Sequence, residues 1–98
     1  MRGVAAAPAA LHLAAEAFHP PSGRAMALWT DAPGCQLYIG GFLDGERGKG
    51  GAVYAQHAGF CLETQVFPDA INQRGFPSPV LRPGEEYIHT MVSQFTAR

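Results

Sequence analysis

Glu63 is the residue of this sequence whose type and setting best suit acid–base chemistry. It lies in the stretch 60–66, where apolar and polar side chains alternate as they do in a β-strand. Alternation places Glu63 on the same face as Cys61 and Gln65. A carboxylate with apolar neighbours is expected to be partly removed from water, which suits a general base near neutral pH. The pattern alone also allows a structural glutamate on a half-exposed strand.

The other reactive side chains form no recognisable catalytic or metal-binding pattern. The four histidines are His12, His19, His57 and His89. None of them makes an HxH or HExxH spacing, so no metal site is predicted. The serines lack the sequence context of a hydrolase nucleophile. Cys35 and Cys61 lack a CxxC spacing, so we expect both to be reduced residues of the interior.

The elements that must position these residues are expected to be strands. They cover 11–18, 24–30, 35–39, 60–66 and 86–96, and turns rich in proline and glycine separate them. The first two should pair as a hairpin, with Leu11, Leu13, Ala15 and Ala17 on one face. The stretch 44–51 should be an exposed loop. Asp69 and Asn72 should lie in another loop, with their side chains bonded to their own backbone. The alanines of 11–18 would also tolerate a helix, but no stretch shows a convincing helix pattern. The predicted class is therefore all-β, with antiparallel strands in a sandwich.

The composition excludes several kinds of partner. The formal net charge is −1 and the basic residues are scattered, so neither nucleic acid nor an anionic membrane surface is expected as a partner. No apolar run reaches the length of about 18 residues that a membrane span needs. Pro8 and His12 interrupt the apolar residues near the N-terminus, which argues against a secretory signal. We therefore expect a small neutral ligand and a cytoplasmic location.

A series of motifs resembles the aldose 1-epimerase, or galactose mutarotase, family. The motifs are Pro33-Gly34-Cys35-Gln36-Leu37-Tyr38, Phe42-Leu43-Asp44-Gly45, Gly59-Phe60-Cys61-Leu62-Glu63-Thr64-Gln65, Phe67-Pro68-Asp69-Ala70-Ile71-Asn72-Gln73, Phe76-Pro77-Ser78 and Leu81-Arg82-Pro83-Gly84-Glu85-Glu86-Tyr87. Family members are much longer β-sandwich proteins. The resemblance implies that residues 19–98 are the C-terminal part of such a domain, a partial sandwich from the mutarotase-like supersandwich. Residues 1–18 form an N-terminal segment without recognised resemblance.

The resemblance also implies a reaction and its site residues. Family members interconvert the α and β anomers of free aldoses such as galactose and glucose, without a cofactor. By residue-for-residue match, Glu63 is the catalytic base that takes the proton of the C1 hydroxyl, and Gln36 is the glutamine that contacts the sugar. The family's acid histidine belongs to a segment absent here, so the acid role falls on none of the four histidines. The sequence looks truncated, and the chain is expected to be nearly inactive alone.

Two other interpretations stay open at this point. One is a non-catalytic β-module that binds carbohydrate through Gln36, Trp29 and further aromatic side chains. The other is a non-functional remnant, because removing most of a sandwich exposes apolar faces and unpaired strand edges. Self-association through the exposed sheet would compensate for that exposure.

Overall fold

The fold consists of antiparallel strands and confirms the all-β prediction. The computed structural model describes residues 10–98, with seven strands and two short 3₁₀ helices in that range. The strands are β1 (His12–His19), β2 (Arg24–Thr30), β3 (Gly34–Tyr38), β4 (Glu46–Arg47), β5 (Val53–Tyr54), β6 (Cys61–Gln65) and β7 (Met91–Ala97). The helices are η1 (Lys49–Gly51) and η2 (Ala70–Asn72). The sheets have the strand orders β1-β2-β7, β3-β6 and β4-β5, and every pairing is antiparallel.

Strands β1 and β2 form the expected hairpin, but β1 carries a β-bulge. The turn between them contains Gly23 with φ of +73°, a conformation that glycine adopts without strain. Leu13 pairs with Trp29, whereas Ala15 pairs with Leu28, so the register shifts between Leu13 and Ala15. The prediction that Leu13 and Ala15 share one face is therefore wrong, because the bulge interrupts the alternation.

Strand β7 is shorter than expected because its partner strand ends. The sequence predicts a strand over 86–96, whereas β7 begins at Met91, which pairs with Thr30 at the end of β2. Asp31 then opens the turn toward β3, and Thr90 bonds to Asp31 instead of to a strand. The ladder of β7 thus stops where β2 offers no further partner.

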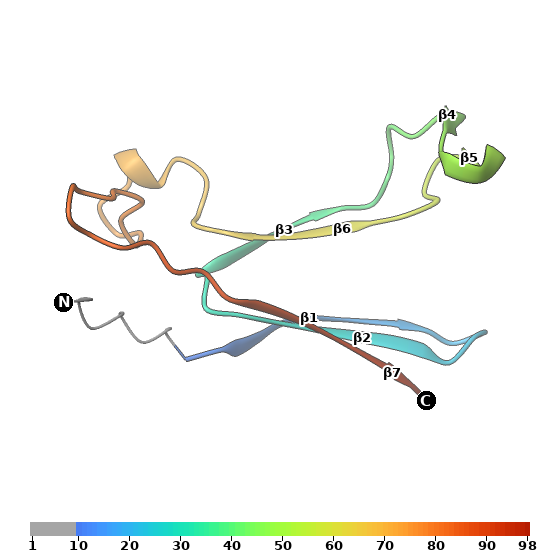
Figure 1. The fold of residues 1–98 in the computed structure, drawn as a ribbon, viewed down its shortest axis with the longest axis horizontal. Helices are drawn as coiled ribbons and strands as arrows, with labels where there is room; N and C mark the ends of the chain where they lie inside the picture. Colours follow the sequence, from blue (N-terminus) through green and yellow to red (C-terminus); the bar gives the residue numbers. More distant parts are fainter. Residues whose placement is uncertain (1–9) are drawn as a thin grey trace.

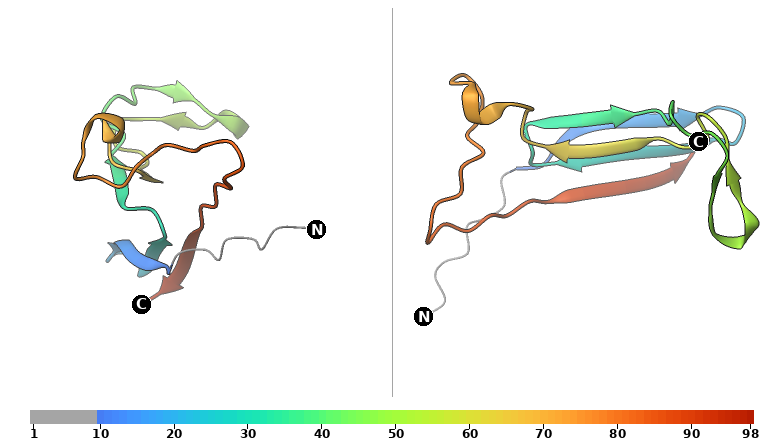
Figure 2. Two further views of the ribbon diagram at one scale, coloured as in Figure 1. Left: turned by 90° about the vertical axis from the view of Figure 1, so that its left-hand side faces the viewer. Right: turned by 90° about the horizontal axis from the view of Figure 1, so that it is seen from above.

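The two larger sheets face each other and leave an open interior. Figure 1 shows β3 and β6 as a layer above β1, β2 and β7, and Figure 2 shows the layers from two further directions. Leu28 and Thr30, which point between the layers, are 1% and 0% exposed. A cavity of about 640 Å³ also lies there, and its lining includes Ala15, Ala17, Leu37, Ile39, Phe60 and Leu62. The radius of gyration is 17.7 Å, against about 13 Å for a compact domain of this size, so the sandwich is partial.

Two of the predicted loops differ from expectation. Within the glycine-rich stretch 44–51, Glu46–Arg47 forms β4, which pairs with β5. The side chains of Asp69 and Asn72 bond to each other and not to their own backbone. The Asp69 carboxylate accepts hydrogen bonds from the side-chain amides of Gln73 and Asn72 at 2.9 and 2.6 Å. These two bonds lower the pKa of Asp69 and brace the turn at η2.

The first residues of the chain lie outside the described range. Residues 1–9, which carry most of the stretch compared above with a secretory signal, are not described. Strand β1 covers His12–His19 and is hydrogen-bonded to β2 along its length, so this part of the N-terminal segment belongs to the sheet. Within residues 10–98, no helix has the length and apolar character needed to cross a bilayer.

The small core leads to a stability prediction. Leu28→Ala is expected to lower the free energy of unfolding by about 2–5 kcal/mol, because it empties one of the few fully buried positions. Leu37→Ala is the matched control, since Leu37 is 62% exposed and its truncation should change stability by no more than about 0.5 kcal/mol. Urea unfolding followed by far-UV circular dichroism measures both. Equal losses in the two variants would contradict the described burial.

Candidate functional site

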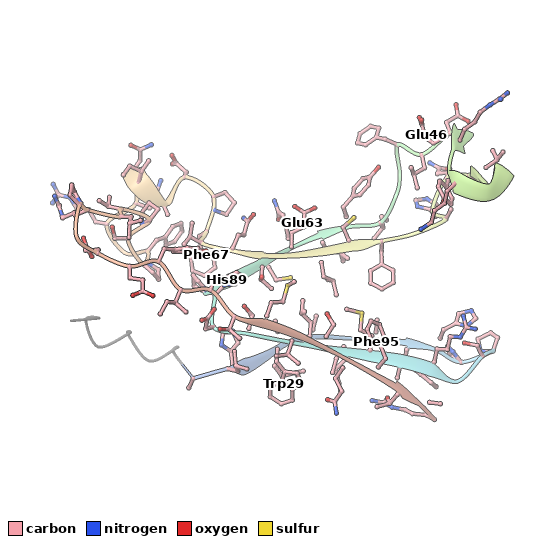
Figure 3. All side chains as sticks on the ribbon, in the orientation of Figure 1. Trp29, Glu46, Glu63, Phe67, His89 and Phe95 are labelled. Atoms are coloured by element: carbon pink, nitrogen blue, oxygen red, sulfur yellow. The ribbon has the colours of Figure 1, made fainter. Side chains whose placement is uncertain are left out.

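Gln36 and Glu63 lie directly opposite each other in the ladder between β3 and β6. Residues in such positions have Cβ atoms about 4.5–5.5 Å apart, so the amide and the carboxylate share one face of the sheet. Figure 3 shows Glu63 on the side of β6 that points away from β1, β2 and β7. The structure therefore brings together the two residues that the sequence singled out.

Both side chains are exposed, so the prediction that Glu63 is partly removed from water is wrong. The neighbours of Glu63 in the chain, Leu62 and Thr64, point to the opposite face, because side chains alternate along a strand. Within residues 10–98, this sheet contains only β3 and β6, and no further layer covers the face that carries Glu63. The apolar side chains that the sequence suggested around Glu63 thus lie on the opposite face of the strand.

An aromatic pair lies on the same face as Gln36 and Glu63. Tyr38 is two residues beyond Gln36 and pairs with Cys61, which places its ring beside them. This ring stacks on Phe42 at a centroid distance of 6.4 Å, and the Tyr38 hydroxyl accepts the N–H of Phe42 at 3.0 Å. Phe42 is 91% exposed. Strand alternation could have indicated Tyr38, whereas Phe42 lies beyond the strand and has no such signal.

The two cysteines point to opposite faces of this sheet. Cys35 pairs with Thr64 on the face toward β2 and β7, and Cys61 pairs with Tyr38 on the other face. Both thiols are free, and this placement cannot bring the sulfur atoms into disulfide geometry. The expectation that both are interior residues is wrong for Cys61, which is exposed.

A chain of polar contacts connects the sheet of β6 to the start of β7. The His89 ring approaches Asp31 through Nδ1, with an Nδ1–Oδ1 distance of 2.8 Å, and approaches the Thr64 hydroxyl through Nε2, also at 2.8 Å. Since a carboxylate only accepts, Nδ1 carries a hydrogen and donates it to Asp31. The Thr64 hydroxyl also lies 3.3 Å from the sulfur of Met91. Residues far apart in the sequence thus meet at one point.

The Asp31 carboxylate is the fixed end of this chain of contacts. Its side chain is 6% exposed, and the Thr90 N–H donates to both carboxylate oxygens at 3.1 Å. The backbone N–H of Asp31 donates in return to the Thr90 carbonyl at 3.3 Å. The Thr90 N–H lowers the pKa of Asp31 most, and the His89 ring lowers it further, while burial opposes them. The carboxylate is therefore held in its charged form.

The remaining histidines are placed elsewhere. His57 donates its Nδ1 hydrogen to the carbonyl of Ile39 at 2.8 Å, which ties the end of β3 to the following loop. His12 and His19 lie at the ends of β1 in the other sheet. None of the four histidines is paired with Glu63, whose partner across the ladder is Gln36. In the described part of the chain, no group of three or more His, Cys, Asp or Glu side chains is placed to hold a metal ion.

Trp29 lies on the far side of the molecule from Glu63. Figure 3 shows Trp29 pointing away from the space between the sheets, on the opposite side from Glu63. The neighbouring Leu28 and Thr30 point into that space, as their burial shows. The structure therefore does not bring Trp29 and Gln36 to one face, and the surface proposed for a carbohydrate-binding module is divided between two sides.

Comparison with known proteins gives one consistent result. The family model described as Aldose 1-epimerase matches residues 4–94. A galactose mutarotase of Homo sapiens is 55% identical over 86 residues, which are 87% of this chain and 25% of that protein. An aldose 1-epimerase of Escherichia coli K12 is 42% identical over 72 residues, which are 71% of this chain and 21% of that protein. The chain thus spans about a quarter of the length of the curated relatives it matches.

The lowered pKa of Asp31 predicts how stability depends on pH. The carboxylate stabilises the fold fully above about pH 4, the ordinary range for aspartate, and its contribution is lost as the pH falls through the lowered folded-state pKa. Stability should therefore decrease on acidification, and Asp31→Asn should flatten that decrease. Urea unfolding at several pH values between 2 and 6 measures it. Asp44→Asn, at an exposed loop position, is the control, and an unchanged slope in Asp31→Asn would contradict the prediction.

Proposed function

This chain belongs to the aldose 1-epimerase family, and we propose that it carries the general base of an enzyme that interconverts the α and β anomers of aldoses such as galactose and glucose. In this proposal Glu63 takes the proton from the C1 hydroxyl of the sugar. An acid protonates the ring oxygen, the ring opens, and it closes again on the other face of the carbonyl. The reaction is an isomerisation, so it consumes no cofactor.

The placement of Gln36 opposite Glu63 is the observation that carries this proposal. The reaction needs a carboxylate that can reach the C1 hydroxyl and a group that keeps the sugar in place while the ring opens. The Gln36 amide can both donate and accept hydrogen bonds, so it can hold a neighbouring sugar hydroxyl. Both side chains are exposed on one face, where a monosaccharide can reach them together. This supports carbohydrate binding at the same face.

The general acid is assigned to none of the four histidines. His89 is engaged by Asp31 and Thr64, and His57 by the Ile39 carbonyl. We therefore propose that the acid comes from a part of the enzyme other than residues 10–98. A base without its acid forfeits most of the rate, since both act in one turnover.

We also propose a cytoplasmic location. The two thiols are free and lie on opposite faces of one sheet. Such unpaired cysteines are compatible with a reducing compartment.

The role of Glu63 is tested in a hybrid enzyme. The matched 86 residues of the Homo sapiens galactose mutarotase are replaced by those of this chain, which are 55% identical to them. The hybrid should speed the change in optical rotation of fresh α-galactose, measured by polarimetry. Glu63→Gln in the hybrid should reduce kcat by about 10²–10⁴-fold, because the amide cannot accept the proton.

Glu46→Gln is the matched control for that experiment. Glu46 lies in β4, on the small hairpin away from Glu63, and its replacement should leave kcat unchanged (Figure 3). The 98-residue chain without the rest of the enzyme should show little acceleration. A hybrid whose activity survives Glu63→Gln would contradict the proposal, and galactose binding without turnover would favour a carbohydrate-binding module.

The open apolar faces lead to a further proposal, that the chain self-associates. Phe60 and Phe95 are 52% and 74% exposed, and removing such area from water favours association. Light scattering after size-exclusion chromatography should show dimers or larger species that dissociate on dilution. Phe95→Lys should shift the equilibrium toward the monomer. A monomer at every concentration would contradict this proposal.

A further inference from the structure

We infer that Asp31 and His89 are positioning residues for Glu63, and that they act through the hydroxyl of Thr64. The inference rests on the proposed function in one respect only, namely that Glu63 is the catalytic base. Neither residue is proposed to contact the sugar. They hold the strand that carries the base at a fixed place and in a fixed orientation.

Packing holds β6 only weakly. Among residues 10–98, β6 pairs only with β3, and a cavity of about 640 Å³ separates the two from β1. Leu62 points into this space but is only half-buried. Apolar contacts fix the spacing of the sheets in a closed sandwich, whereas here the cavity occupies part of the space between them.

Polar contacts provide a second connection to β6. The bond between Thr64 Oγ1 and His89 Nε2, at 2.8 Å, connects β6 to the segment just before β7, and His89 is itself fixed by Asp31 at 2.8 Å. Asp31 is nearly buried and anchored by two bonds from the Thr90 N–H. The anchor therefore cannot move without breaking several hydrogen bonds at once.

The same contact fixes the orientation of Glu63. Thr64 and Glu63 are consecutive residues of one strand, so their side chains point to opposite faces. A bond that keeps Thr64 directed inward therefore keeps Glu63 directed outward, beside Gln36. If β6 rolled or slipped by one residue, the carboxylate would turn into the space between the sheets.

Nuclear magnetic resonance of the labelled 98-residue chain tests this inference. Thr64→Val removes the hydroxyl and keeps the shape, Thr64→Ser keeps the hydroxyl, and Thr96→Val alters an exposed threonine of β7 as the control. The first readout is the order parameter of the Glu63 amide. It should be about 0.85 in the wild type, Thr64→Ser and Thr96→Val, and fall toward about 0.6 in Thr64→Val. The second readout is the ¹⁵N chemical shift of each His89 ring nitrogen. The shift of Nε2 should change only in Thr64→Val.

Each outcome decides for or against the positioning role. A lower order parameter of Glu63 in Thr64→Val but not in Thr64→Ser supports the positioning role. Thr64→Ser keeps the hydroxyl and loses only the methyl group, so a loss of packing would affect it as well. Equal order in all variants overturns it. A wild-type chain with a mobile Glu63 amide, or with no hydrogen-bonded Nδ1–H on His89, also overturns it, even if Thr64→Val does not fold.

The same experiment separates this inference from the proposed function. Mobility of β6 is measured without sugar, so it is independent of whether the chain takes part in epimerisation. If Glu63→Gln leaves the hybrid enzyme active, the proposed function fails while the tether through Thr64 can still be present. If the hybrid behaves as proposed but Thr64→Val leaves Glu63 rigid, only the positioning inference fails.

Discussion

The register of the β3–β6 ladder is the constraint on which the rest of this structure depends. It places Gln36 opposite Glu63 and, by alternation, directs Leu37 and Leu62 to the other face. A polar face and an apolar face therefore arise from the same set of backbone hydrogen bonds. A shift of one residue would exchange the two faces and leave a carboxylate among apolar side chains.

In this chain, hydrogen bonds help to hold the strands of the two layers in place, which is mainly the role of apolar packing in larger sandwiches. The described core is small, with Leu28 and Thr30 as its fully buried side chains. The Thr64–His89 hydrogen bond connects β6 to the segment before β7, and the nearly buried carboxylate of Asp31 holds His89 in place. Hydrogen bonds to a charged group are stronger than those between neutral groups, so a few of them can hold an arrangement that a thin core cannot.

Local patterns in the sequence predicted most of the strands but not how the strands meet. Alternation identified the hairpin of β1 and β2 and the strands that carry Gln36 and Glu63. It could not show the bulge after Leu13, which depends on the pairing with β2. Alternation could not predict the exposure of Glu63 either, because exposure depends on which layers cover a sheet. The contact between Asp31 and His89 joins residues 58 positions apart, and no local signal marks such a meeting point.

The position of Trp29 has a practical consequence for experiments on this chain. Trp29 is its single tryptophan, and it lies on the outer side of the sheet of β1, β2 and β7, away from Glu63. Its fluorescence will therefore report the folding of that sheet and remain silent when a ligand occupies the face of Gln36. The molecule thus carries a spectroscopic probe of folding that is separate from its candidate site, so loss of structure can be told apart from loss of ligand.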